Sequence, residues 1–184
     1  MNNQTIRLAI WVTRISKVLL VLFYTIMMAI IIYWFIEPAS FIEWELTAPL
    51  SPGSMGFRFN QTTAGTGVPM DELSRTTMTW LAIRATLFFV LVWLGLGRVL
   101  KVLLSVKANQ TFFRENVRHF QQLSTIGILF TILSAFNFGG AEGGGVHVNF
   151  SIPFIPLLFT LGCYVLAEIF REGGRLREDS SSII

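Results

Sequence analysis

A charged residue inside a long apolar run is the first feature of this sequence with a chemical meaning. Arg84 lies in the apolar run from Met78 to Leu104, about two helical turns from its start. A cation at such a depth in a membrane is costly unless it reaches water or pairs, so it is by default a candidate for a functional site. Two interpretations stay open. Arg84 lines a polar pathway, or it has a structural role, in which it snorkels outward or pairs with Glu37, Glu142 or the outer sheet.

The usual catalytic and metal-binding patterns do not occur in the sequence. It has no H-E-x-x-H motif, no paired aspartates inside an apolar run, and no Ser–His or Cys–His set that would supply a nucleophile with its base. Cys163 is the single cysteine and lies in an apolar run, which is typical of a packing residue. His147 has no second ligand at metal-binding spacing. We therefore expect no catalytic residue, no metal and no cofactor, and a protein that is not an enzyme.

The elements that carry these residues are typical of a membrane protein. The chain has 184 residues, of which 53% are hydrophobic and only 14% are charged, and its mean hydropathy is +0.61. Such a chain has too little polar material to cover a soluble core. Its four apolar runs predict an all-α integral membrane protein with one four-helix domain over residues 1–184. The expected helices span about 16–36, 77–105, 112–138 and 153–171, and the expected outer loops span 37–76 and 139–152.

Basic residues are distributed unequally along this pattern. Eleven lie in the N-terminal segment, the central stretch 98–118 and the tail, against Arg58 and Arg75 in the two opposite loops. Cytoplasmic segments of membrane proteins carry the excess of Lys and Arg. The sequence therefore predicts a multi-pass protein with both termini in the cytosol.

The two outer loops contain segments in which apolar and polar residues alternate. These segments are Ile42–Leu46, Met55–Asn60 and Val146–Ile152. Alternation at period two is typical of strands with one covered face, so we expect a small extracytoplasmic β-sheet that caps the helices. Tyr33 and Trp34, just before the first loop, suit the boundary between membrane and water.

The third apolar run and the stretch before it are the most polar part of the helical region. Ser124, Thr131 and Ser134 predict either a face packed against a neighbouring helix or a polar ligand pocket. The preceding basic and aromatic residues are typical of an interfacial helix on an anionic lipid leaflet. Nucleic-acid binding would need a larger basic surface. The expected partner is thus the lipid bilayer, with no direct contact to nucleic acid.

Two segments carry a resemblance to a known family. Residues 109–118 (NQTFFRENVR) resemble the G-x-PF-x-x-EN signature of the bacterial membrane-protein family catalogued as domain of unknown function 2975 (DUF2975), and residues 166–178 (LAEIFREGGRLRE) resemble its closing motif. The most specific matches are Phe113, Glu115 and Asn116, with the last dozen residues of the second segment. The sequence departs from the family at Phe112, where the family usually has proline, and at residues 109–110, where it has a glycine.

The resemblance implies four membrane helices in a bacterial cytoplasmic (inner) membrane and no established activity. Genes of this family often lie beside one for a small helix-turn-helix regulator. We therefore expect a non-enzymatic regulatory or sensory partner of such a cytosolic regulator. The alternative is a small transporter or channel subunit, assembled as a homo-oligomer, that uses Arg84 and the polar face of the third helix.

The candidate functional or structural residues combine the charged position in the second helix with the two family motifs. Glu115 or Glu168 is expected to pair with a basic residue of the tail and so to lock the second helical hairpin to it. The full set is Arg84, Phe113, Glu115, Asn116, Glu168, Arg171 and Arg175.

Overall fold

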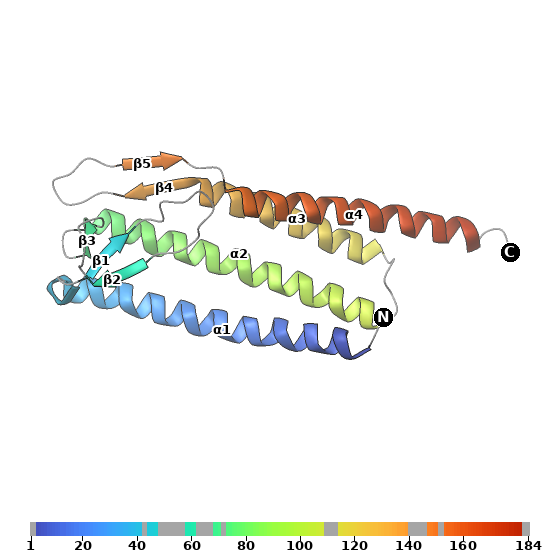
Figure 1. Cartoon of the computed structure of the whole chain (residues 1–184), viewed down its shortest axis with the longest axis horizontal. Coiled ribbons are helices and arrows are strands. Elements are labelled where there is room, and N and C mark those ends of the chain that lie inside the picture. The colour runs from blue at the N-terminus through green and yellow to red at the C-terminus, as the bar shows by residue number, and fades with distance from the viewer. Residues whose placement is uncertain are drawn as a thin grey trace. The chain divides into compact units, whose positions relative to one another are not determined.

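Four helices and five short strands make up the chain in the order in which Figure 1 labels them. The computed structural model describes residues 3–41, 44–47, 58–61, 68–70, 73–108, 114–139, 147–150 and 153–181. The helices are α1 (Asn3–Ile36), α2 (Arg75–Lys107), α3 (Arg114–Ala135) and α4 (Phe154–Ser181), with a 3₁₀ turn at Pro38–Phe41. The strands are β1 (Trp44–Thr47), β2 (Arg58–Gln61), β3 (Val68–Pro69), β4 (Phe136–Gly139) and β5 (His147–Phe150).

The chain forms two compact units. Unit 1 contains Met1–Val21, Val90–Phe130 and Ile155–Ile184, and unit 2 contains Leu22–Phe89 and Thr131–Phe154. The first two helices, α1 and α2, contribute residues to both units. Each unit is therefore described by its own contacts.

Local signals account for several helix ends. Ser74 is the N-cap of α2, because its Oγ accepts a hydrogen bond from the backbone N–H of Thr77 at 3.2 Å. The last turn of α1 closes with the backbone N–H of Glu37 donating to the carbonyl of Tyr33 at 2.9 Å. Pro38 follows, and the residue before a proline disfavours continued helix. These two boundaries lie within two residues of those expected from sequence.

Three of the other boundaries differ more. Helix α1 begins at Asn3 instead of about 16, and α4 continues to Ser181 instead of about 171. The apolar runs mark only what can lie in a membrane, whereas a helix continues through flanking polar residues until a breaker or a competing contact ends it. Helix α3 is shorter than expected, because residues 136–139 leave the helix and form β4.

Three helices have the length and the apolar composition needed to cross a membrane. They cover Gln4–Ile36, Arg75–Lys107 and Phe154–Leu176. Helix α3 is the fourth helix among the described residues, and its polar side chains keep it below that composition. The expectation of four helices is thus confirmed, and three of them have the length and apolar composition that a membrane span requires.

The strands form two separate sheets. In the first, β1 pairs antiparallel with β2, from Trp44 opposite Gln61 to Thr47 opposite Arg58. It also pairs antiparallel with β3, where Glu45 lies opposite Pro69 and Leu46 opposite Val68. In the second, β4 and β5 form an antiparallel pair, from Phe136 opposite Phe150 to Gly139 opposite His147. The three expected strand segments therefore do contain strands, but the single capping sheet is wrong. The segment at 146–152 pairs with residues adjacent to it in sequence, because a hairpin closes a shorter loop than a distant strand does.

A small apolar core holds unit 2 together. The buried side chains are Trp34, Met70, Leu73, Met78 and Leu81, with Phe41 packed against them. The indole Nε1 of Trp34 donates to the carbonyl oxygen of Met70 at 2.6 Å. Trp34, which the sequence places near the membrane boundary, is buried inside the protein, with only 3% of its surface exposed. The ring packs inside the protein since its one N–H has a buried acceptor there.

In unit 1, side-chain contacts link the four helices in sequence order. Lys17 of α1 lies over the ring of Trp93 of α2, with Nζ 4.8 Å from the ring centroid. On α3, Phe120 stacks on Phe170 of α4 at a centroid distance of 5.1 Å. The Oγ of Ser124 donates to the carbonyl oxygen of Thr160 of α4 at 3.4 Å.

Gly127 sets the distance between α3 and α4. A Cβ atom added there would lie 2.3 Å from Oγ1 of Thr160 and 3.4 Å from its backbone Cα. Oγ1 of Thr160 already donates to the carbonyl of Pro156 at 2.8 Å, so moving it would break a buried hydrogen bond. Small residues at such crossings allow membrane helices to approach closely.

Replacing Trp34 by phenylalanine should destabilise unit 2. Trp34→Phe leaves the buried carbonyl of Met70 without its donor, which costs about 1–3 kcal/mol of the free energy of unfolding. Denaturation of the purified protein in detergent measures this, with Trp11→Phe as the control because Trp11 is 64% exposed. Equal stability of the two variants would contradict the assigned hydrogen bond.

Replacing Gly127 by alanine should destabilise the contact between α3 and α4. Overpacking of this kind costs about 1–3 kcal/mol, more than the helix propensity gained by replacing glycine. Gly162→Ala is the matched control, because a Cβ there meets nothing within 4 Å. We expect the thermal midpoint to fall by several degrees for Gly127→Ala and to stay or rise for Gly162→Ala. The same shift in both would show that α3 does not approach α4 this closely.

Candidate functional site

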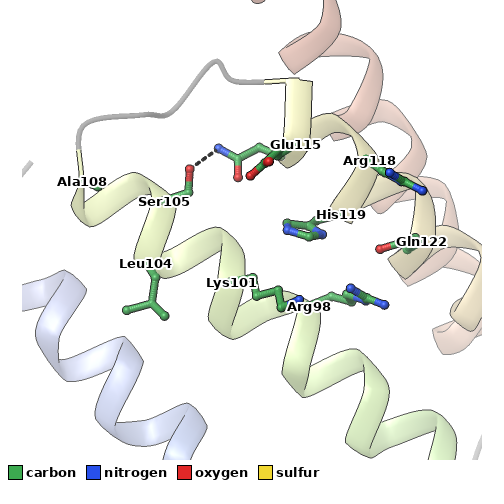
Figure 2. Close-up of a pocket in the computed structure, with 10 residues that line it drawn as sticks. Arg98, Lys101, Leu104, Ser105, Ala108, Glu115, Arg118, His119 and Gln122 are labelled. Carbon is green, nitrogen blue, oxygen red and sulfur yellow. Dashed lines mark hydrogen bonds between the residues drawn. The ribbon is translucent and has the colours of Figure 1, made fainter.

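The candidate site is a pocket of about 720 Å³ in unit 1, between the last turns of α2 and the first turns of α3. Figure 2 shows its lining from both helices. From α2 come Arg98, Lys101, Leu104, Ser105 and, just after the helix, Ala108. From α3 come Glu115, Asn116, Arg118, His119 and Gln122.

Helical periodicity explains why these residues line one space. On α2, residues 98, 101 and 105 are spaced by three or four, and on α3 residues 115 and 116 each lie three or four residues before 119, which lies three before 122. Residues at these spacings lie on one face of a helix. Two faces of this kind, one from each helix, enclose the pocket.

A partly buried hydrogen bond joins the two helices beside the pocket. Asn116 is fully buried, with 0% of its surface exposed, and its Nδ2 donates to Oγ of Ser105 at 2.9 Å. The dashed line in Figure 2 marks this bond. An amide in such a position holds the first turn of α3 against the end of α2, since breaking the bond would leave polar groups buried without a partner.

The pocket has an excess of positive charge. Arg98, Lys101 and Arg118 are its three cationic side chains, and Glu115 is its one carboxylate, so its formal charge is +2 with His119 neutral. Lys101, Glu115 and Arg118 are exposed, whereas Arg98 is partly buried. The pocket also lies against the start of α3, where the helix macrodipole contributes further positive potential.

Two neutral polar atoms of the lining are buried without a hydrogen-bond partner among the described residues. They are Nδ1 of His119 and Oε1 of Gln122. Figure 2 shows the His119 ring between α3 and the segment of α2 that carries Lys101 and Ser105. Most buried polar side-chain atoms in proteins are paired with protein or with ordered solvent. A polar molecule that enters the pocket would offer such atoms a partner.

The structure brings only some of the expected site residues together. Glu115 and Asn116 line the pocket, whereas Phe113 lies outside the described residues. Glu168 pairs with Arg171 of its own helix, and both side chains are mostly exposed. That pair therefore does not lock the second hairpin to the tail. Arg175 is exposed on the same helix, α4.

Arg84 lies in unit 2 and does not belong to the pocket. It is partly buried in the third turn of α2, and its Cζ lies 5.4 Å from the ring centroid of Phe88. Its expected partner Glu142 lies outside the described residues. On Glu37, Oε2 accepts a hydrogen bond from the hydroxyl of Tyr33 at 3.3 Å.

The polar face of α3 is in part a packing face. Ser124 and Gly127 are buried, and both contact Thr160 of α4. Thr125 is exposed and donates to the carbonyl of Gln121 in its own helix at 3.1 Å. Of the two interpretations left open by the sequence, helix packing accounts for these residues of unit 1. Within the described part of the chain, no three His, Cys, Asp or Glu side chains lie together as metal ligands would.

Sequence reasoning missed the contribution of α2 to this site. Arg98 and Lys101 entered only as part of a charge count, and Ser105 and Gln122 were not considered at all. The signal that would have found them is the repeat of polar residues at spacings of three or four on either side of the turn. It becomes meaningful only once α2 and α3 are known to be adjacent.

The comparison with known proteins identifies a family. The family model described as "Protein of unknown function (DUF2975)" matches residues 59–184. This range contains α2, α3 and α4 and all of the pocket. No curated protein and no solved structure matches the chain.

The bond between Asn116 and Ser105 can be measured by a double-mutant cycle. Asn116→Ala and Ser105→Ala should each lower the free energy of unfolding, and the double variant should lose about 1 kcal/mol less than their sum. Chemical denaturation in detergent measures this coupling, with Gln121→Ala as a control at an exposed position of α3. Strictly additive effects would contradict the contact.

Proposed function

The chain belongs to the DUF2975 family, and we propose that it is a non-enzymatic, multi-pass protein of the bacterial cytoplasmic membrane that holds a small helix-turn-helix regulator at its cytosolic face. The observation that carries this proposal is the basic character of unit 1, where the ends of α2, α3 and α4 supply exposed cations. An acidic surface on a soluble partner would complement them, and such complementarity governs encounter and specificity.

The distribution of charge supports the orientation in this proposal. Eleven basic residues lie in the segments assigned to the cytosol, against Arg58 and Arg75 in the loops assigned to the outside. Helices α1, α2 and α4 are long and apolar enough to cross. For both termini to lie in the cytosol, α3 must cross as well. Its contact with α4 at Ser124 and Gly127 covers part of its polar face, which is how a less apolar helix can be accommodated in a bilayer.

Arg118 and Arg175 are the residues that we assign to partner binding. Both are exposed, on α3 and α4 of unit 1. Arg171 is less available, because it pairs with Glu168. Arginine side chains are suited to this role, since the planar guanidinium binds carboxylates through two parallel hydrogen bonds.

The alternative, a small oligomeric transporter or channel subunit, has less support. It requires Arg84 and the polar face of α3 to line one pathway. Ser124 and Gly127 on that face instead contact Thr160 of α4, and Arg84 contacts Phe88.

Replacing both arginines should release the regulator from the membrane. We expect the membrane-bound fraction of a fluorescent fusion of a small helix-turn-helix regulator from the native host to fall about tenfold in Arg118→Gln/Arg175→Gln, which corresponds to about 1.4 kcal/mol of binding. Imaging and membrane fractionation measure this in the native host. The control is Arg75→Gln, an exposed arginine at the start of α2 that belongs to unit 2.

Retention that is unchanged in the double variant, at normal levels of inserted protein, would refute the proposed role. If ion or solute flux into proteoliposomes were then found and Arg84→Leu abolished it, the transporter alternative would replace the proposal.

A further inference from the structure

We propose that the pocket between α2 and α3 binds a phosphate group, either from the headgroup of an anionic phospholipid or from a small soluble phosphate compound. The pocket joins features that are separate in the sequence: cationic side chains from two helices, neutral hydrogen-bonding groups and a helix start. This inference does not depend on the proposed regulator, although the two proposals share Arg118, which also lines the pocket. The pocket is therefore tested through Arg98 and Lys101, which the test of partner binding leaves unchanged.

The charges of the pocket favour an anion. Arg98 and Lys101 approach it from α2 and Arg118 from α3, and Glu115 alone opposes them. Helix α3, which is 22 residues long, begins beside the pocket and adds the positive end of its dipole. A phosphate oxygen can accept from guanidinium, ammonium and hydroxyl groups at once, so one group can engage several of these donors.

The buried neutral groups favour a ligand with oxygen acceptors. Nδ1 of His119 and the amide of Gln122 have polar atoms in the lining without a partner among the described residues. In one tautomer of the imidazole Nδ1 carries a proton, and rotation of the Gln122 amide by a half turn places its NH₂ where Oε1 lies. Both side chains can therefore donate to a phosphate oxygen without any change in the backbone.

The size of the pocket accommodates more than a bare ion. About 720 Å³ lies within the range of small-molecule sites. Leu104 adds an exposed apolar side chain to the lining. A phosphate ester with a short organic group fits this combination.

The position of the pocket along α2 favours a lipid as the source. Arg98 and Lys101 follow the most apolar part of a helix long enough to cross a membrane, so in a bilayer they lie at the level of the headgroups. Basic pockets between helices on the cytoplasmic side are suited to anionic headgroups. A soluble phosphate compound would reach the same groups from the cytosol, and the experiment separates the two sources.

Binding should be measured on the full chain purified in a neutral detergent. The probes are short-chain phosphatidylglycerol, phosphatidylcholine with the same chains, inorganic phosphate and glycerol phosphate, each titrated calorimetrically at low and at physiological salt. The pocket variants are Lys101→Gln and Arg98→Gln. The matched control is Lys107→Gln, which removes the same charge from an exposed position at the end of α2 but does not line the pocket.

We expect saturable binding that Lys101→Gln and Arg98→Gln each weaken about tenfold, since a hydrogen bond to a charged group is worth about that factor. Lys107→Gln should leave the affinity unchanged. Glu115→Gln should tighten binding, because it removes the one opposing charge. His119→Leu should weaken binding, and its thermal unfolding tests whether the variant is still folded.

The pattern across the probes identifies the source. Binding of phosphatidylglycerol but not of phosphatidylcholine, lost in the pocket variants, assigns the site to a lipid headgroup. The site is assigned to a soluble compound if glycerol phosphate or inorganic phosphate binds, if the pocket variants lose this binding, and if phosphatidylglycerol is not preferred over phosphatidylcholine. The proposal is overturned if no probe binds, or if Lys107→Gln weakens binding as much as Lys101→Gln, because general surface charge would then explain the effect.

Discussion

The approach of α3 to α4 is the constraint on which the rest of unit 1 depends. Helix α3 is the least apolar of the four described helices. Its polar side chains need partners where they are buried, and the backbone of α4 supplies one of them. Gly127 allows Thr160 to lie close enough for the carbonyl of Thr160 to accept from Ser124. Further along the same pair of helices, Phe120 stacks on Phe170. A small residue, a hydroxyl and an aromatic pair thus let a semi-polar helix belong to a membrane protein.

The other side of α3 meets α2, and there the polar groups leave space between them. The bond from Asn116 to Ser105 holds the two helices together at one point. One turn further along α3, His119 lies across from the basic residues of α2, and the pocket begins. This partly buried hydrogen bond both holds the two helices together and orients the pocket lining. Glu115 and Asn116 of the family motif can therefore have a structural role while the pocket binds a ligand.

Unit 2 is organised differently, around an aromatic side chain with one polar atom. Trp34 combines a large apolar surface with one N–H group, and the carbonyl of Met70 receives it inside a core made of α1, α2 and the segment between them. Near the middle of α1, Tyr24 stacks on Phe89 at 4.2 Å and its hydroxyl lies 3.2 Å from that of Thr86. Contacts of this mixed kind determine how two helices align where apolar matching alone would allow many registers.

The sequence by itself determined what depends on neighbours along the chain. Apolar runs located the four helices, alternation located β1, β2 and β5, and the family motif pointed to Asn116, which the structure places in the pocket lining and shows to be buried. What only the tertiary structure decided concerns partners distant in sequence. These include the separation of the strands into two sheets, the burial of Trp34, and the pocket that adds Arg98, Lys101 and Ser105 to the motif of α3. The physical reason is that hydropathy and helix periodicity are properties of a local segment, whereas a hydrogen bond or a cavity exists only between two surfaces whose adjacency no local pattern records.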